Sequence, residues 1–129
     1  MQLTPAHIGI VISDLDASTA FYRALGFEIS ADHPWDDGSR AIRFMKLDDF
    51  EIELFWYAET PPAPPVAEGK QLGFRHFALA TDDVDATLAE LKSAGIVPAD
   101  IEARTVGLGY RIAFIYDPDG IEIELSQAL

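Results

Sequence analysis

The sequence predicts an α+β fold made of two tandem βαβββ modules, each with one strand, one helix and three further strands. The first observation is an internal repeat: the run that begins at His7 recurs at His76, at an offset of 69 residues. The second is a pair of matched segments, 50–54 and 121–125, which closes the two halves at an offset of 71 residues. Repeats of this kind indicate a duplicated structural unit.

The start of the first module is predicted from hydrophobic periodicity. Residues 6–12 form a short apolar run rich in β-branched side chains, which is typical of a buried strand. Ser13 or Asp14 can cap the helix that follows, and Gly26 can end it. The apolar residues at helical spacing, which we expect to face the core, are Ala17, Ala20, Phe21, Ala24 and Leu25.

Three strands complete the first module, and the second module repeats the same order. In the first module they are expected at 27–33, 41–47 and 50–57. In the second, a strand at 74–80 precedes a helix that Asp82 or Asp83 caps and Gly95 ends. Its apolar stripe is Val84, Leu88 and Leu91. Its last three strands are expected near 97–103, 110–116 and 121–126.

A proline-rich connector joins the two modules. We place module 1 at residues 1–57, the connector at 58–72 and module 2 at 73–129. Clustered prolines favour an extended, semi-rigid chain. A module of roughly 60 residues is only marginally stable alone, so we expect both modules to form a single domain.

Composition excludes several classes of function. A formal net charge of −13 opposes binding to nucleic acid or to anionic membranes. No apolar run approaches the roughly 20 residues of a membrane-spanning helix. The N-terminus has no basic segment followed by an apolar one, so we expect a cytoplasmic protein. Because the chain has no cysteine, a metal site would need His, Asp and Glu ligands.

One histidine and one glutamate recur at matching points of the repeat. These residues are His7 with Glu53 and His76 with Glu124. In each closing strand the glutamates alternate with apolar residues, so they lie on the face opposite the core. Imidazole and carboxylate together suit divalent Zn, Ni, Co, Mn or Fe. Four such ligands on a six-coordinate ion would leave positions open to substrate.

Each of these residues also has a simpler interpretation. A single histidine on an apolar strand is more often a core residue than a ligand, and a glutamate between aliphatic residues usually faces water. Glu51 and Glu122 fit that description, or else lie next to the ligands. Recurrence at equivalent positions favours the four-ligand site. His33 has no counterpart in the repeat and is interpreted as an ordinary surface or loop residue.

Several motifs resemble the vicinal oxygen chelate superfamily, also called the glyoxalase/bleomycin-resistance/extradiol-dioxygenase group. They are His7 before the run 10–16, Phe21 to Phe27, Glu53 to Phe55, His76 to Ala78, and 117–120 leading to Ile123, Glu124 and Leu125. The resemblance covers essentially the whole chain. It implies paired modules that curl into a half-open barrel around one metal ion, and commonly a homodimer.

The resemblance also implies a reaction on a small-molecule substrate. Isomerase, lyase and epimerase members add a fourth ligand from the last strand of the first module, where this chain has Glu53. The implied activity is that of a lactoylglutathione lyase (glyoxalase I): metal-assisted transfer of an α-proton through an enediolate, on a substrate with neighbouring oxygens. By similarity, Glu124 is the principal base, and Glu53 is a ligand and possible second base.

Two alternatives stay open at this point. One is a non-catalytic drug-binding protein of the bleomycin-resistance type, and the other is an epimerase of the methylmalonyl-CoA type. Glutathione and coenzyme A conjugates are anionic, whereas the chain has only nine Lys and Arg residues. The basic residues near the predicted cavity strands or loops are Arg40, Arg43, Lys46, Arg104 and Arg111.

Overall fold

The structure is a computed structural model that describes residues 1–64 and 70–129. Its contacts group into two units, Met1–Ala63 and Pro64–Leu129, and each unit has its own sheet and helix. Part of the predicted connector, residues 65–69, lies outside the described residues. The union of both modules in one domain stays a prediction.

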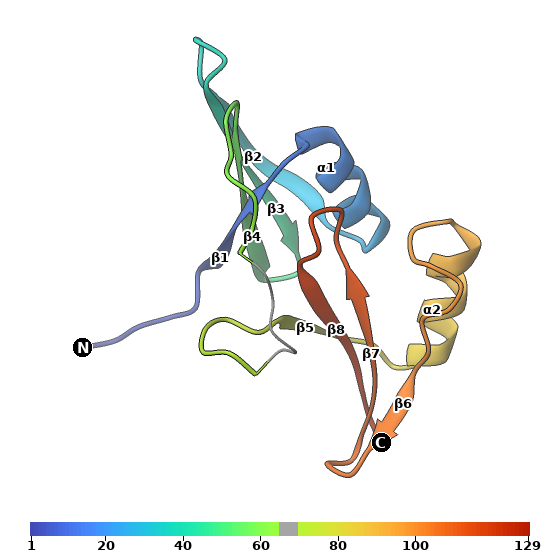
Figure 1. The fold of residues 1–129 in the computed structure, drawn as a ribbon. Helices are drawn as coiled ribbons and strands as arrows, with labels where there is room; N and C mark the ends of the chain where they lie inside the picture. The colour runs from blue at the N-terminus through green and yellow to red at the C-terminus, as the bar shows by residue number, and fades with distance from the viewer. Residues whose placement is uncertain (65–69) are drawn as a thin grey trace. The chain divides into compact units, whose positions relative to one another are not determined.

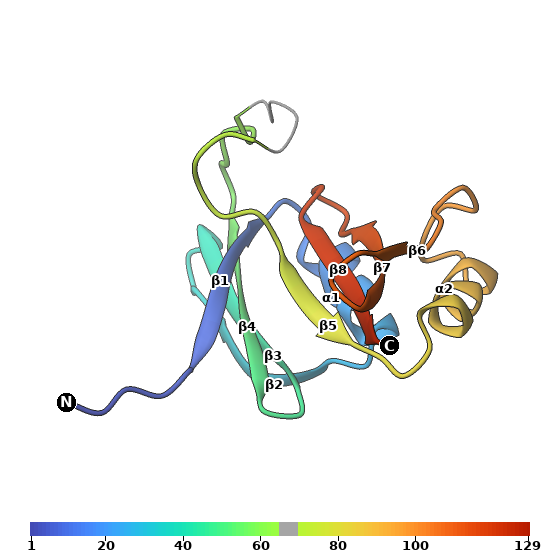
Figure 2. The ribbon, with the colours of Figure 1, turned by 90° about the horizontal axis from the view of Figure 1, so that it is seen from below.

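Unit 1 is a four-stranded mixed sheet with one helix (Figure 1). The sheet order is β1-β4-β3-β2, with β1 parallel to β4 and the other neighbours antiparallel. Figure 2 shows β1 and β4 side by side, with the N-terminal segment leading away from β1. The elements are β1 (His7–Ile12), α1 (Leu15–Ala24), β2 (Glu28–Pro34), β3 (Arg40–Leu47) and β4 (Phe50–Tyr57).

Unit 2 repeats this topology with the order β5-β8-β7-β6. Strand β5 is parallel to β8, and the other neighbours are antiparallel. The predicted α+β class with two tandem βαβββ modules is therefore confirmed, and both sheets are open. The elements are β5 (Phe77–Ala80), α2 (Val84–Ser93), β6 (Arg104–Val106), β7 (Tyr110–Tyr116) and β8 (Glu122–Ala128).

Both helices begin at an aspartate cap. The Asp14 side chain accepts a hydrogen bond from the Ala17 backbone N–H at 3.0 Å, and Asp83 accepts one from the Ala86 N–H at 2.9 Å. Each bond satisfies a backbone donor that the first helical turn leaves unpaired. Asp83, rather than Asp82, is thus the cap of α2.

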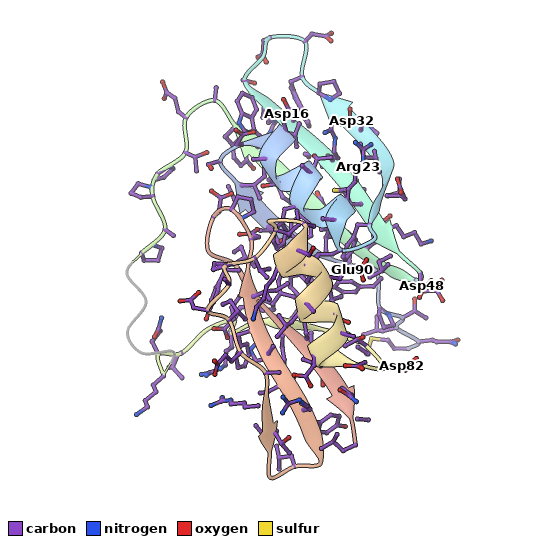
Figure 3. The ribbon with its side chains drawn as sticks, turned by 90° about the vertical axis from the view of Figure 1, so that its right-hand side faces the viewer. Asp16, Arg23, Asp32, Asp48, Asp82 and Glu90 are labelled. Carbon is purple, nitrogen blue, oxygen red and sulfur yellow. The ribbon has the colours of Figure 1, made fainter. Side chains whose placement is uncertain are left out.

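The helix ends also match the sequence. Figure 3 labels Asp16 in the first turn of α1 and Arg23 in its last turn, where each charge opposes the nearer end of the helix dipole. Gly26 and Gly95 follow the two helices with φ of 102° and 71°. Glycine adopts these left-handed conformations without a Cβ clash, so each helix stops where predicted.

The predicted inner faces of the closing strands are confirmed. Ile52 and Leu54 in β4 are fully buried, as is Ile123 in β8, and Leu125 is nearly so. The intervening glutamates are only partly buried. Alternation therefore separates an apolar face of each sheet from a face that carries the glutamates.

The predicted core face of α1 is wrong in part. Phe21 is buried, but Ala17, Ala20 and Ala24 are exposed. The large rings of Phe21 and Tyr22 remove more apolar area from water than alanine methyl groups do, so the helix turns them inward. The residues buried in α1 are Ser18, Thr19, Phe21 and Tyr22. In α2 the predicted stripe of Val84, Leu88 and Leu91 is confirmed.

Two predicted strands of unit 2 are also displaced. The segment 97–103 is not a strand, because Pro98 starts a turn in which the Ile101 N–H reaches the Pro98 carbonyl at 3.4 Å. The second strand of the module is β6, which follows that segment. Strand β5 begins at Phe77 rather than Phe74. His76 therefore lies directly before β5.

Candidate functional site

The first His–Glu pair is formed by His7 of β1 and Glu53 of β4. Because β1 and β4 are parallel with Gly9 opposite Glu53, His7 and Glu53 project from the same face of the sheet. The His7 Nε2 atom lies 2.8 Å from Glu53 Oε2. A Cβ on Gly9 would come within 3.1 Å of the Phe55 ring. Because glycine has no Cβ, the Phe55 ring can occupy that space beside the pair.

The second pair is formed by His76, just before β5, and Glu124 of β8. Ala78 lies opposite Glu124 in the parallel register, as Gly9 lies opposite Glu53. The His76 Nε2 atom lies 3.1 Å from Glu124 Oε2. Both side chains are about four-fifths buried, with 22% and 20% exposed. The repeat thus brings the same two atom types together in each unit.

Equivalent phenylalanines flank the two pairs. Phe44 of β3 lies opposite Glu53, and Phe114 of β7 lies opposite Glu124. Each ring centroid is 5.4 Å from the centroid of its histidine. These contacts shield one side of each imidazole and hold its orientation.

The second pair has an additional contact with the carboxylate of Glu122. Glu122 Oε1 lies 3.2 Å from His76 Nδ1, and the Tyr116 hydroxyl donates to Glu122 Oε2 at 3.1 Å. Partial burial, and after it the hydrogen bond to Glu122, raises the pKa of Tyr116. In unit 1 the equivalent Glu51 instead accepts a hydrogen bond from the Ser30 hydroxyl at 2.8 Å.

The sequence prediction named Glu122 as a possible neighbour of the ligands but missed Tyr116 in this contact. Tyr116 and Glu122 are opposite residues at the end of the β7–β8 hairpin, so pairing across the turn was the available signal. His33 is exposed, as predicted, and it lies in β2, which corresponds to the strand expected at 27–33. Its ring centroid is 6.5 Å from that of Phe44.

The strand register separates the five basic residues expected near the cavity into two groups, according to the face of the sheet on which they lie. Arg43 binds Asp32 and the Thr19 hydroxyl, and Arg111 binds Asp85, on the helix-facing sides of their sheets. The residues that share a face with a His–Glu pair are Arg40, Lys46 and Arg104. Arg40 stacks on the Trp35 ring, with its guanidinium carbon 4.1 Å from the ring centroid.

Each unit on its own supplies two of the predicted ligands. Among the described residues of either unit, no group of three or more His, Asp and Glu side chains is arranged to hold a metal ion. The four-ligand site of His7, Glu53, His76 and Glu124 therefore stays a prediction. No helix in the described part of the chain is long and apolar enough to cross a bilayer.

Comparisons with known proteins agree with this architecture. The uncharacterized protein YwbC of Bacillus subtilis is 34% identical over 127 residues, covering 94% of each chain. Human mitochondrial methylmalonyl-CoA epimerase is 27% identical over 95% of this chain and 72% of its own. A probable lactoylglutathione lyase of Vibrio cholerae is 27% identical over 94% of this chain and 88% of its own.

A solved structure has the same architecture. The glyoxalase family protein from Enterococcus faecalis superposes with a TM-score of 0.79 at 28% identity, covering 96% of this chain and 97% of that one. The family model of the glyoxalase/bleomycin resistance protein/dioxygenase superfamily matches residues 4–125. The match spans both modules, including both His–Glu pairs. The chain belongs to this superfamily.

Proposed function

We propose that the protein is a divalent-metal-dependent lyase or isomerase of the glyoxalase I type. It would transfer the α-proton of a small substrate that carries neighbouring oxygens. The observation that supports this most directly is the recurrence of one contact, His Nε2 to Glu Oε2, at 2.8 Å in unit 1 and 3.1 Å in unit 2. We also expect a homodimer, as is common in the superfamily.

The donor atoms fit a metal ion. Imidazole nitrogen and carboxylate oxygen are ligand atoms that divalent ions such as Zn²⁺ take in proteins. The structure brings one of each within 2.8 Å in unit 1 and within 3.1 Å in unit 2. We assign His7, Glu53, His76 and Glu124 as the ligands. A bound divalent ion would supply the positive charge that acidifies the α-proton.

The protein's own residues would carry the proton. Glu124 is assigned as the principal base, because a carboxylate beside the substrate can take up a proton and return it. Glu53 is assigned as a ligand and second base, which suits its equivalent place in the first module. Phe44 and Phe114 would keep water from one side of each histidine. Water exclusion strengthens electrostatic interactions at the site.

The distribution of charge supports a small substrate. Arg43 and Arg111 already neutralise Asp32 and Asp85. Of the five basic residues considered above, Arg40, Lys46 and Arg104 share a face with a His–Glu pair, in a chain of net charge −13. This charge weighs against coenzyme A esters, which carry several phosphate groups, relative to a smaller and less anionic substrate.

An epimerase of the methylmalonyl-CoA type is a second candidate, which the relative at 27% identity favours. Such an enzyme also moves an α-proton, but it returns the proton to the opposite face of the carbon. Product stereochemistry distinguishes the two reactions. A drug-binding protein of the bleomycin-resistance type is the third candidate, for which we expect stoichiometric ligand binding without metal and without proton exchange.

Metal analysis combined with proton exchange tests the proposal. Purified protein should contain about one divalent ion per chain. In deuterated water it should exchange the α-proton of the hemithioacetal formed from glutathione and methylglyoxal, or of methylmalonyl-CoA, as followed by NMR. A chelator should abolish this exchange, and added metal should restore it. A protein that takes up no divalent ion would contradict the proposal.

A further inference from the structure

The two His–Glu pairs differ on the far side of the imidazole. His76 contacts one carboxylate through each ring nitrogen: Glu122 at Nδ1 and Glu124 at Nε2. Within the described residues of unit 1, His7 has one polar side-chain partner, Glu53 at Nε2. Both units therefore contain the His–Glu pair, but within the described residues only His76 has a second carboxylate, at its other ring nitrogen.

The contacts of Glu122 determine where the His76 proton lies. An ionised carboxylate can only accept hydrogen bonds, and Glu122 already accepts one from the Tyr116 hydroxyl on Oε2. A tyrosine hydroxyl is protonated at neutral pH, since its ordinary pKa is about 10, so it is the donor in this contact. The 3.2 Å contact at Oε1 therefore requires a proton on His76 Nδ1. In the neutral ring, Nε2 then carries a lone pair.

This tautomer directs the Nε2 lone pair towards Glu124. Two acceptor atoms 3.1 Å apart repel each other unless a positive charge lies between or beside them. A divalent cation satisfies both atoms, with release of any second ring proton. At His7, by contrast, no second carboxylate within the described residues of unit 1 fixes the position of the ring proton in this way.

We infer that Glu122, held by Tyr116, is a positioning residue that fixes His76 with Nε2 free for a divalent cation, making the second pair the anchor of the metal site. The inference rests on the proposed metal-dependent function. It names residues that act through His76 and do not themselves bind the ion. An anchored His76 would keep the ion in place while Glu124 moves to take up the substrate proton.

Zinc affinity measured against a chromophoric chelator tests the inference. Removing a hydrogen-bond partner of a metal-binding histidine typically weakens metal binding by about 10- to 100-fold. We expect that loss for Glu122→Ala, a smaller loss for Tyr116→Phe, and partial recovery for Glu122→Gln, whose amide oxygen still accepts from Nδ1. Glu51→Ala is the matched control, because it removes the same charge from the equivalent position of unit 1.

The ring nitrogens of His76 provide a second measurement. In the zinc-loaded protein, nitrogen-15 NMR should show Nε2 as the metal-bound nitrogen and a slowly exchanging proton on Nδ1. In Glu122→Ala that proton should exchange rapidly with solvent. Circular dichroism and urea unfolding of the metal-free variants confirm that each is folded, so an affinity change is not a folding defect.

The outcomes separate this inference from the proposed function. If the wild type binds zinc and exchanges the substrate proton, but Glu122→Ala binds zinc equally well, only the role of Glu122 is refuted. The same holds if Glu51→Ala loses as much affinity as Glu122→Ala, or if Nδ1 proves to be the ligating atom. If the wild type binds no divalent ion, the proposed function fails as well.

Discussion

The two modules share a fold and a His–Glu pair, yet they surround their histidines differently. His76 is 22% exposed and has a carboxylate at each ring nitrogen, whereas His7 is 40% exposed and contacts one carboxylate within the described residues of its unit. Glu122 supports the second histidine, while its counterpart Glu51 binds Ser30. Duplication therefore provides equivalent donor atoms, and later sequence change can give each copy its own role.

The largest expected effect comes from comparing the two paired glutamates. We expect Glu124→Gln to lower the rate of α-proton exchange by about 10²- to 10⁴-fold, the usual contribution of a general base. Glu53→Gln should mainly weaken metal binding, with a smaller loss of rate once metal is saturating. NMR exchange rates at several zinc concentrations measure both effects. Equal rates for Glu124→Gln and the wild type would reject Glu124 as the base.

The same contrast shows how far the sequence alone could lead. The repeat singled out His7, Glu53, His76 and Glu124, and the structure brings His7 to Glu53 and His76 to Glu124. The convergence of all four side chains on one ion stays a prediction. The contact of Tyr116 with Glu122 depends on side-chain rotamers at a hairpin end. Periodicity cannot specify those rotamers.

The helices illustrate a related limit. In α2 the apolar residues and the buried residues coincide, so the pattern identified the core face correctly. In α1 the buried face includes Ser18 and Thr19, and the exposed positions carry alanine. The Thr19 hydroxyl donates to the Leu15 carbonyl at 2.6 Å and accepts from Arg43 at 3.0 Å. The Ser18 hydroxyl, by contrast, is buried without a hydrogen-bond partner in the described part of the chain. A hydrophobicity pattern has no signal for polar residues that lie inside the fold, whether or not they are hydrogen-bonded.

An intermediate effect on stability tests that difference between the helices. Leu88 and Thr19 occupy equivalent repeat positions, and both are buried. Leu88→Ala should cost about 2–5 kcal/mol, because it leaves a cavity. Thr19→Ala should cost less: it loses hydrogen bonds worth about 1 kcal/mol each but gains roughly 0.5 kcal/mol of helix propensity.

Urea unfolding at neutral pH measures both free energies of unfolding. Ala20→Ser, on the exposed side of α1, is the control and should change stability by no more than about 0.5 kcal/mol. If Thr19→Ala proved as damaging as Leu88→Ala, the polar contacts of α1 would carry as much stability as the apolar packing of α2.

The smallest expected effect compares the two arginine–aspartate pairs under acid. Hydrogen bonds from Arg43 hold the pKa of Asp32 below its ordinary value of 3.8, and those from Arg111 do the same for Asp85. A depressed carboxyl pKa stabilises the fold above pH 3.8, and this contribution disappears as the pH falls through the folded-state pKa. Asp32→Asn and Asp85→Asn should each therefore reduce stability near neutral pH and flatten its decline in acid.

Asp32→Asn should have the larger effect of the two. The Asp32 side chain is 43% exposed and its arginine 15%, whereas Asp85 and its arginine are 59% and 29% exposed. Water and salt screen the more exposed pair more strongly, so its stabilisation is smaller. Urea midpoints near neutral pH and near pH 3, each at low and high salt, compare the variants. A larger or salt-independent effect at Asp85 would show that burial does not set the strength of these pairs.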